Sequence, residues 1–454
     1  MVTQENFKEC KEMIKRDLND NKSDIRLSAG DIEEIFDELW PICRSITGDG
    51  LRDSFRILQK IIPLQLHEIT SGTKVFDWEV PDEWNIKDAY IITPEGKKIA
   101  DFHKNNLHVV NYSVPVDREV SYDELVNHLH YKKDLPKAIP YIASYYKERW
   151  GFCVTYETFK NLPREGKYKV KIDSSLKKGS LTYGDLVLPG ELDEEILFSS
   201  YLCHPSMANN ELSGPLTLAF LYNELKKIKN RKYSIRFVIA PETIGAICYL
   251  HQNKEKLQNK LKAGFVLTCC GDDGSITYKK TRQEDSLTDR VAEHVLENSN
   301  QNFDTLPFDP IGSDERQYSS PGFNFPVGVM MRTPFSKYPQ YHTSLDNKSL
   351  MNFDKMVELI KILSDIVKSF DLNTTYENQI TYGEPFLGKR NLFEDLNSKL
   401  SHSEIIKRRL RLLNFLDGER DLLSICEKYG YSILEVEKEI NQLLEHHLIK
   451  DPRF

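Results

Sequence analysis

From Glu194 to Phe370 the sequence alternates apolar strands with amphipathic helices, and this alternation limits the possible folds more than any other feature. A helical pattern follows each of four runs typical of buried strands: EILFSSYLC, YSIRFVIAP, GFVLTCC and FPVGVMM. Several of these strands are apolar at nearly every position, which is typical of sheets covered on both faces. The sequence therefore predicts a three-layer α/β/α domain with a mixed sheet.

The same domain extends to the N-terminal part of the chain. Apolar residues recur at helical spacing from Asp31 to Trp40 and from Ser54 to Ile62. We assign these helices, residues 25–65, to one domain with residues 181–375. Residues 1–24 are polar and charged, so we expect a helical leader there and no signal peptide.

A second region, residues 66–180, has a different character. Short β-rich runs such as KVFDWEV, AYIITP and KYKVKI are separated by turn residues, and Ser121 to His130 is the one clear helical segment. This pattern indicates a β-rich domain inserted into the α/β domain.

The C-terminal region, residues 389–454, follows a polar connector from Thr374 to Gly388. Its Leu-rich helical segments, separated by a short turn, predict a winged-helix-like module. Ser432 and Glu435 have the spacing of a capping box at the start of a helix. Such a module offers a contact surface for another protein, for nucleic acid or for a second copy of the chain.

A basic stretch in this module, which consists of Lys407, Arg408, Arg409 and Arg411, fits a solvated helix face better than a DNA contact, because acidic residues abound nearby. The whole chain of 454 residues, about three domains at roughly 150 residues each, carries 61 basic and 69 acidic residues and a net charge of −8. This balance argues against a coat for nucleic acid or anionic membrane. With no apolar run of ~20 residues and eight scattered cysteines, we expect a cytoplasmic protein without a membrane span.

Polar residues follow the predicted strands at the edge where functional residues gather in α/β sheets. His204 follows the first strand and precedes Asn210 and Glu211; Glu242 follows the second, and His342 lies after the last. Imidazoles and carboxylates are natural ligands of a hydrolytic zinc ion, and a nearby Glu is a suitable general base. Structural roles are the alternatives: a strand-end cap for His204, a local turn around His342, a buried carboxylate for Glu242 and a helix cap for Asn210 and Glu211.

Two other groups allow a structural interpretation as well. Cys269 and Cys270 follow the third strand, and we expect them to be small buried residues. Asp314, Glu315 and Arg316 are expected either at the mouth of the site or in a solvated loop.

The order of these motifs resembles that of the M28-type zinc aminopeptidases. In that family a His after one strand precedes Asp-Asn-x-Ser-Gly, Glu-Glu-x-Gly, a further Asp and Tyr-His-Thr-x-x-Asp. The segments LWPICRSITGDGLR, CHPSMANNELSG, GSDERQYSSPGFNFPVG and YPQYHTSLDN are similar to a bacterial group of M28-like proteins. That group combines an aminopeptidase-like domain, an inserted β-rich domain and a C-terminal winged helix.

The resemblance implies roles for single residues. His204 and His342 match the metal histidines, Glu242 matches the general base, and Asn210 stands where the family has a bridging Asp. Glu211, next to Asn210, is a further candidate ligand.

This sequence also departs from the family. Thr243 stands in place of a ligand Glu, Cys269 lies close to the place of a ligand Asp, and Ser206 replaces the Asp that orients the first histidine. Because an amide oxygen is a poorer zinc ligand than a carboxylate, these departures favour one zinc ion over two.

Two functions remain open from the sequence. The first is a zinc aminopeptidase or amidohydrolase, in which Glu242 deprotonates a zinc-bound water that attacks a peptide or another small amide. The second is a catalytically degenerate protein of the same fold, which binds or regulates through its winged helix. A scaffold that uses this module for dimerisation is a third, weaker alternative.

Overall fold

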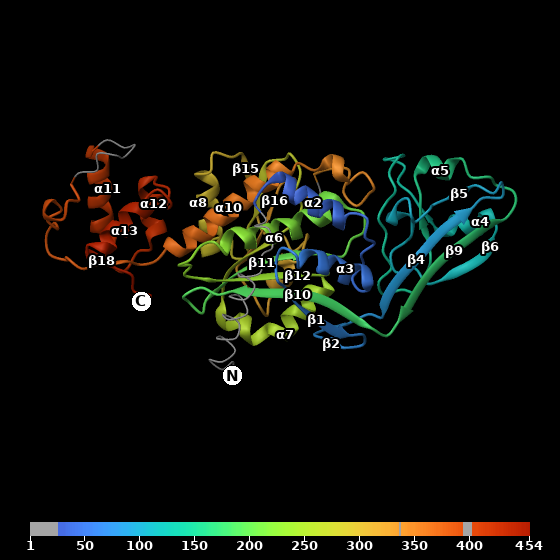
Figure 1. Cartoon of the computed structure of the whole chain (residues 1–454), viewed down its shortest axis with the longest axis horizontal. Helices are drawn as coiled ribbons and strands as arrows, with labels where there is room; N and C mark the ends of the chain where they lie inside the picture. Colours follow the sequence, from blue (N-terminus) through green and yellow to red (C-terminus); the bar gives the residue numbers. More distant parts are fainter. Residues whose placement is uncertain (1–25, 336, 394–401) are drawn as a thin grey trace.

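The computed structural model describes residues 26–335, 337–393 and 402–454, and the helical leader expected at 1–24 lies outside these ranges. Figure 1 shows the α/β domain in the middle, the β-rich insertion on one side of it and the C-terminal module on the other. Across the described ranges, no helix combines the length and the apolar run that crossing a membrane would require.

The α/β domain is built on an eight-stranded sheet with the strand order β1-β10-β12-β11-β13-β16-β14-β15. The four central strands β12, β11, β13 and β16 are parallel, whereas β10 runs antiparallel to both of its neighbours and β14 runs antiparallel to β16 but parallel to β15. The sheet is therefore mixed, as the sequence predicts. Its strands span Gln65–Thr70 (β1), Ser180–Leu188 (β10), Glu195–Tyr201 (β11), Ser234–Ala240 (β12), Leu261–Leu267 (β13), Ile276–Lys279 (β14), Phe303–Leu306 (β15) and Val327–Met331 (β16).

Helices cover both faces of this sheet because successive side chains of each strand point to opposite sides. Ile196 and Phe198 of β11 pack on one face, while Leu197 between them packs on the other. The first face is covered by α2 (Ala29–Leu39), α3 (Asp49–Leu58), α6 (Ser213–Leu225), α8 (Leu287–Glu297) and α10 (Phe353–Leu372), and the second by α7 (Ile244–Lys260) and α9 (Glu315–Tyr318). This is the predicted three-layer architecture.

The insertion has its own antiparallel sheet, with the strand order β5-β4-β9-β6 and a separate apolar core. The predicted helix from Ser121 to His130 is confirmed in part: α4 spans Tyr122–Leu125 and a 3-10 turn follows at Val126–His128, but Leu129–His130 form a short strand. The elements here are β4 (Glu83–Ile92), β5 (Lys98–Ile99), β6 (Val116–Val120), β7 (Leu129–His130), β8 (Phe152–Cys153), α5 (Tyr156–Lys160) and β9 (Tyr168–Lys177), with the small hairpin β2 (Lys74–Val75) and β3 (Trp78–Glu79) before them.

The C-terminal module contains α11 (His402–Phe415), α12 (Leu422–Tyr429) and α13 (Glu437–Glu445), and β17 (Glu377–Asn378) pairs with β18 (Ile449–Lys450). The capping box predicted at Ser432 is wrong, since α13 begins only at Glu437 and the Glu435 amide donates to the Ser432 carbonyl within a turn. The domain bounds drawn from the sequence remain predictions.

This module packs directly on the α/β domain. Arg290 of α8 contacts Asp421 at 3.1 Å and Glu427 at 2.9 Å, and the Ile433 amide donates to His294 Nε2 at 3.0 Å. Apolar residues of the module also belong to the same core cluster as α10. The module is therefore attached to the α/β domain by polar and apolar contacts together.

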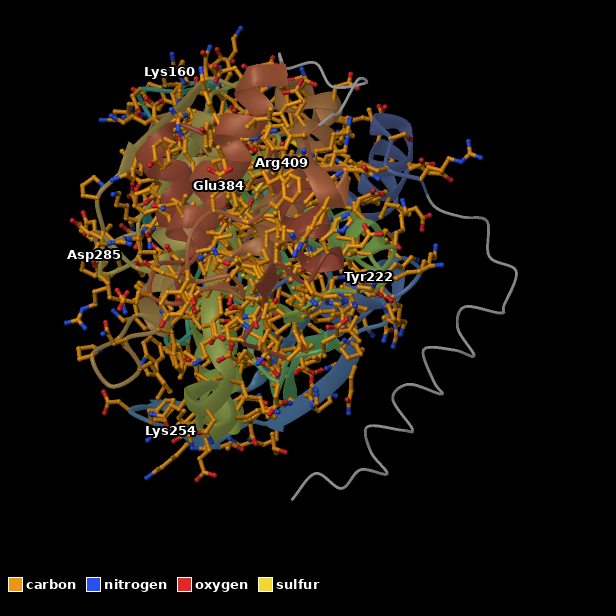
Figure 2. The ribbon with its side chains drawn as sticks, turned by 90° about the vertical axis from the view of Figure 1, so that its left-hand side faces the viewer. Lys160, Tyr222, Lys254, Asp285, Glu384 and Arg409 are labelled. Atoms are coloured by element: carbon orange, nitrogen blue, oxygen red, sulfur yellow. The ribbon has the colours of Figure 1, made fainter. Side chains whose placement is uncertain are left out.

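The basic stretch of the module is not a solvated face. Arg408 is 9% exposed and Arg409 2%, and Arg408 Nε donates to Glu439 at 2.9 Å. Figure 2 looks onto this end of the molecule, where Arg409 is labelled. The expectation of a solvated face is therefore wrong for these two arginines, because their guanidinium groups bond within the module.

Candidate active site

The candidate site lies where the parallel strands end. β11 has β12 on one side and β13 on the other, and successive crossovers therefore leave it in opposite directions. Such a switch point opens a crevice beyond the strand ends. His204 follows β11 and Glu242 follows β12, while the loop after β16 carries His342. The fold thus brings together residues far apart in the sequence.

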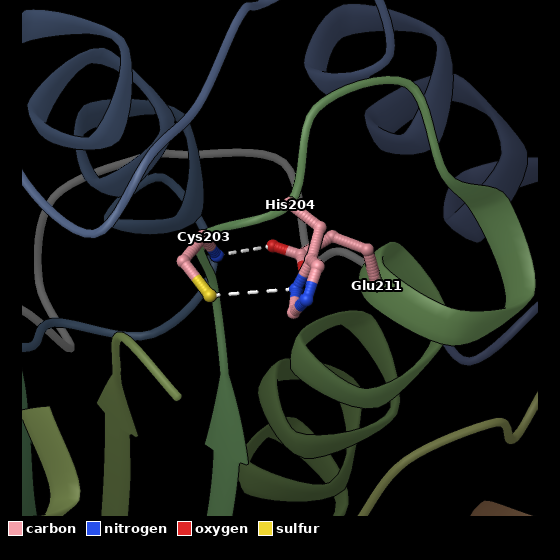
Figure 3. Close-up of side chains that lie close together, drawn as sticks. All are labelled: Cys203, His204 and Glu211. Atoms are coloured by element: carbon pink, nitrogen blue, oxygen red, sulfur yellow. Dashed lines mark hydrogen bonds and ion pairs between the residues drawn. The ribbon is translucent and has the colours of Figure 1, made fainter. Parts of the chain in front are cut away.

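His204 belongs to a buried cluster with Cys203 and Glu211 (Figure 3). His204 Nδ1 lies 2.8 Å from Glu211 Oε2, and the Cys203 amide donates to Glu211 Oε1 at 2.5 Å. Cys203 Sγ lies 3.4 Å from the same Nδ1. One ligand atom from each of the three residues falls within 4.8 Å of the others. The cluster could hold a metal ion only by giving up these hydrogen bonds.

The two ring nitrogens of His204 have different surroundings. Burial alone would lower the pKa of His204, but Cys203, Tyr141 and the bond to Glu211 raise it well above its usual value. Burial also raises the pKa of the Cys203 thiol to about 11, so the thiol stays protonated and is a poor nucleophile or ligand. Arg44 Nε lies 3.8 Å from Glu211 Oε1. The Nδ1 side is thus already occupied, and Nε2 is the atom that can bind a metal ion once the ring has lost its second proton.

Glu242 lies on that Nε2 side. Its Oε2 is 3.7 Å from His204 Nε2, and its side chain is 25% exposed. Burial raises the pKa of the Glu242 carboxyl, while His204 and Arg316 oppose this increase. A raised pKa brings a carboxylate closer to the range in which it works as a general base.

Asp314 supports the loop that follows Glu242. It accepts a hydrogen bond from the Thr243 amide at 2.8 Å and is 2% exposed, and burial together with Glu242 raises its pKa well above the usual range. Glu315 is fully buried and pairs with Lys279 at 2.7 Å. The expectation of a solvated loop at 314–315 is wrong, since both acids are internal.

His342 and Asn210 each carry a buried acceptor atom that is free. Among the described residues, His342 Nε2 and Asn210 Oδ1 have no hydrogen-bond partner. Burial, His204 and Lys132 lower the pKa of His342 to about 3, so its ring is neutral and able to ligate. The ring centres of His342 and His204 are 5.3 Å apart.

Asp346 positions these two residues. Its carboxylate accepts the backbone amides of Asn209 at 2.7 Å and Asn210 at 2.9 Å. The loop that carries His342 is thereby tied to the π-helical turn Ala208–Leu212 that starts α6. Asn210 Nδ2 donates to Tyr201 at 2.8 Å, which directs Oδ1 away from that bond. A π-turn of this kind is often found at functional sites.

In the part of the chain that the structure describes, each of the four strand-end loops contains one non-glycine residue with a positive φ: Ser206 (φ 48°), Thr243 (φ 65°), Cys269 (φ 49°) and His342 (φ 55°). Such backbones are strained and tend to cluster at functional sites. Cys269 and Cys270 are fully buried, as expected, and Cys269 Sγ lies 3.7 Å from the Tyr338 hydroxyl. Thr243 Oγ1 accepts from Arg316 at 2.8 Å.

Three residues of the site were not foreseen from the sequence: Cys203, Arg44 and Tyr141. Arg44 comes from the loop between α2 and α3, and Tyr141 comes from the insertion. The Tyr141 amide donates to the His342 carbonyl at 2.9 Å, and its ring centre lies 5.0 Å from that of His204. Cys203 could have been found from its position next to His204, but no local signal joins Arg44 or Tyr141 to the strand ends.

A cavity of about 720 Å³ opens between the insertion and the α/β domain, and we call it the insertion cavity. The insertion supplies Tyr131, Lys132, Tyr141 and Phe159 to its wall, and the α/β domain supplies Tyr341 and His342. The insertion therefore forms the approach to His342, the one histidine of the pair that lines this cavity.

Comparison with known proteins agrees with this architecture. A family model described as "Domain of unknown function (DUF4910)" matches residues 33–373, and a "winged helix-turn-helix" model matches residues 374–451. A Clostridium acetobutylicum protein named "Putative polysaccharide biosynthesis protein with aminopeptidase-like domain" is 45% identical over 423 residues, which cover 93% of this chain and 96% of the relative.

Two solved structures show the same fold. The crystal structure of a "putative peptidase" from Clostridium acetobutylicum has a TM-score of 0.87 and 44% identity, and the match covers 93% of this chain and 96% of that one. BSAP, a zinc aminopeptidase from Bacillus subtilis, has a TM-score of 0.54 at 12% identity, with 76% and 95% coverage. The predicted aminopeptidase-like fold and winged helix are confirmed.

Proposed function

We propose that this chain, which belongs to the family described as "Domain of unknown function (DUF4910)", is a zinc-dependent hydrolase of amide bonds. The observation that carries the proposal is the pair of buried, unpartnered acceptor atoms, His342 Nε2 and Asn210 Oδ1, beside a histidine whose other nitrogen is held by a carboxylate. Buried polar atoms are normally satisfied, so a free pair of lone-pair donors indicates a missing ligand.

The donor set fits one zinc ion. Two imidazoles that share a tetrahedral zinc at Zn–N distances of about 2.1 Å have ring centres roughly 5 Å apart. The ring centres of His204 and His342 are 5.3 Å apart. His204 Nε2 and His342 Nε2 would hold the ion. Glu242 Oε2, 3.7 Å from His204 Nε2, and Asn210 Oδ1, which has no hydrogen-bond partner among the described residues, are the candidates for a further ligand. With Thr243 and Cys269 bonded elsewhere, the carboxylates for a second ion are missing.

We assign Glu211 to orienting His204 rather than to binding zinc itself. A metal-binding histidine usually donates its second N–H to a carboxylate, which fixes the ring and raises its basicity. Glu211 Oε2 at 2.8 Å from Nδ1 is in that position, and the Cys203 amide holds its other oxygen. Ser206 stands where the family has the Asp that orients the first histidine, and we assign that orienting role to Glu211 in this chain.

Bound zinc supplies Lewis-acid chemistry, since it polarises a carbonyl and acidifies water. Glu242 takes the proton from the attacking water and returns it to the leaving nitrogen, because its partly exposed carboxyl lies beside His204. Tyr141 and Tyr341 limit access of bulk water from the insertion side. The substrate is a peptide or another small amide, such as an N-acylated sugar, and the name of the Clostridium relative mentions polysaccharide biosynthesis.

The winged helix is proposed as a contact surface for another protein. Its basic residues Arg408 and Arg409 are buried, and α13, in the place of a recognition helix, carries the exposed Glu437 and Glu445. These charges repel phosphate, so nucleic acid is the less favoured partner.

Metal analysis and a single variant test the proposal. Purified protein is expected to hold about one zinc per chain, and Glu242→Gln is expected to lower amide hydrolysis by roughly 10²–10⁴-fold while zinc content is kept. Glu255→Gln, an exposed residue on the helix that follows, is the matched control and should leave the rate unchanged. Protein without zinc and without hydrolysis would instead support the degenerate binding protein.

A further inference from the structure

We propose that the insertion cavity selects amides that carry an anionic group and no ammonium group beside the scissile bond. This inference rests on the proposed hydrolase function and names its substrate class. The chain would thus be a deacylase of anionic N-acyl compounds, although its fold is that of an aminopeptidase.

The shape of the cavity excludes the smallest substrates. Its volume of about 720 Å³ is much larger than a single amino-acid side chain needs. Tyr131 and Phe159 line the insertion side of the wall and stack on each other, with ring centres 4.0 Å apart and an interplanar angle of 26°, so this side of the wall is a rigid aromatic surface. Flat aromatic walls suit a substrate with a ring that lies against them.

The charge of the cavity decides the substrate class. Lys132 lies in its wall, whereas among the described residues no Asp or Glu lines it. Lys132 Nζ is 3.9 Å from Asp134, but the Asp134 side chain is 74% exposed and its charge is screened by solvent. Burial, Arg149 and His128 lower the pKa of His130, so this histidine adds no positive charge at neutral pH. The net potential of the wall is therefore positive.

An aminopeptidase has to bind the ammonium group of a free N-terminus, which requires a carboxylate near the scissile bond. Here Lys132 and the proposed zinc would both repel that ammonium. Among the described residues, Glu242 is the partly exposed carboxylate that lies beside His204, and the proton transfer uses it. Asp314 and Glu315 are buried behind the loop and cannot reach a substrate. An acylated nitrogen carries no charge, and a phosphate or carboxylate elsewhere on the substrate would pair with Lys132.

The reaction balances as a simple hydrolysis. Water adds to the acyl carbon, the C–N bond breaks, and the nitrogen leaves with a proton returned from Glu242. The products are a free carboxylic acid and an amine that still carries the anionic group. No oxidant or further reactant is needed.

Substrate preference tests the inference with the zinc-loaded full chain. The probes are N-acetylglucosamine 1-phosphate, N-acetylleucine, neutral N-acetylglucosamine and leucine p-nitroanilide, which has a free ammonium. The two anionic amides are expected to show a kcat/KM about tenfold or more above the others. A comparison of N-acetylglucosamine 1-phosphate with N-acetylleucine shows whether the cavity prefers a phosphate or a carboxylate. A highest kcat/KM for leucine p-nitroanilide would overturn the inference and leave the hydrolase function intact.

Lys132→Gln gives the residue-level test. We expect KM for the preferred anionic amide to rise about tenfold, with kcat within about twofold, because the lost bond is to a charged group. The neutral amide should be unaffected. Lys133→Gln, the exposed neighbour outside the cavity wall, is the matched control. An unchanged KM in Lys132→Gln would contradict the proposal.

A binding experiment separates this inference from failure of the hydrolase function. If no probe is hydrolysed, calorimetric titration of N-acetylglucosamine 1-phosphate into wild type and Lys132→Gln decides. Affinity at least about tenfold higher in the wild type supports an anion-selective cavity, whereas equal affinity or no binding refutes it.

Discussion

Two buried arginine–glutamate pairs lie at opposite ends of β11, and they are built differently. At the start of the strand, Arg236 Nε and Nη2 donate to both oxygens of Glu195 at 2.5 and 2.7 Å, and Nη1 donates to Asp185 at 3.2 Å. Each guanidinium nitrogen of Arg236 has a carboxylate partner. This pair is complete without any ligand.

At the other end, Arg44 meets Glu211 only at 3.8 Å. Within the part of the chain that the structure describes, Arg44 Nε and Nη2 have no hydrogen-bond partner. The oxygens of Glu211 bond to His204 and to the Cys203 amide instead. The same residue types therefore form a closed ion pair at one end and an incomplete cluster at the other.

This difference indicates that the Arg236–Glu195 pair stabilises the fold, whereas the Arg44–Glu211 cluster belongs to a functional site. A bidentate buried pair with no free atom holds the sheet together, and removing one partner leaves an uncompensated charge. A cluster with unpartnered atoms carries a cost that the fold tolerates where a ligand is bound. The following predictions test this distinction, from the largest effect to the smallest.

The largest effect is expected for Arg236→Met. Loss of this arginine leaves Glu195 buried and unpaired, so the free energy of unfolding should fall by about 3–5 kcal/mol in urea titrations. Arg282→Met, at an exposed position, is the control with an effect within about 0.5 kcal/mol. A loss below about 1 kcal/mol at Arg236 would remove the distinction between the two ends.

Zinc binding at the His204 end of β11 should stabilise the folded protein. At a free zinc concentration of 100 Kd, binding to the folded state adds about 2.7 kcal/mol, which thermal unfolding with and without chelator measures. His342→Asn should abolish most of this gain, and Asn is chosen because it tolerates the left-handed backbone at this position. His251→Ala, exposed and outside the site, should retain the gain. An undiminished gain in His342→Asn would exclude His342 as a ligand.

Glu211→Gln should weaken zinc binding without the stability loss of Arg236→Met. Removal of an orienting carboxylate lowers metal affinity by about 10–100-fold, which competition with a zinc-binding dye can measure. Glu224→Gln, in the last turn of α6, should leave the affinity unchanged. Equal affinity in Glu211→Gln would show that His204 is held in place by other contacts.

The smallest effect concerns a structural histidine. Burial lowers the pKa of His294, whose Nε2 accepts from the Ile433 amide of the winged helix. Because the folded-state pKa lies below the unfolded value, the stabilisation is fully present above about pH 6.5 and is lost as the pH falls.

Between pH 7.5 and 5.5 the wild type should lose a few tenths of a kcal/mol more than His294→Gln, after allowance for solvent screening. Gln keeps an acceptor but does not titrate. Unfolding in urea at both pH values measures the difference, and parallel losses in the two proteins would assign no role to His294.

Much of the fold follows from local patterns. The four strands β11, β12, β13 and β16 and the helices after them appear in the sequence as apolar runs and helical spacing. β14 and β15 were missed, because strands of only four residues carry too little periodicity to stand out. The Ser432 capping box failed because its spacing occurs equally in a turn. The buried Arg408 and Arg409 were misjudged because their partner Glu439 and the Leu392 carbonyl lie on other elements.

The candidate site, like the fold, is predicted only in part by the sequence. The strand-end rule singles out His204, Glu242 and His342, because the register of parallel strands places their ends at one edge. It says nothing about Arg44 or Tyr141, which reach the site from the loop between α2 and α3 and from the insertion.

What the sequence by itself determined is the alternation of strands and helices and the residue types at the strand ends, since both depend on spacing along the backbone. Only the tertiary structure decided which atoms are already bonded. Glu211 bonds to His204 Nδ1. Among the described residues, His342 Nε2 and Asn210 Oδ1 have no hydrogen-bond partner, and Lys132 of the insertion lines the cavity. Hydrogen bonds and charge act over a few ångströms in space, so they depend on packing between segments that are distant in the sequence.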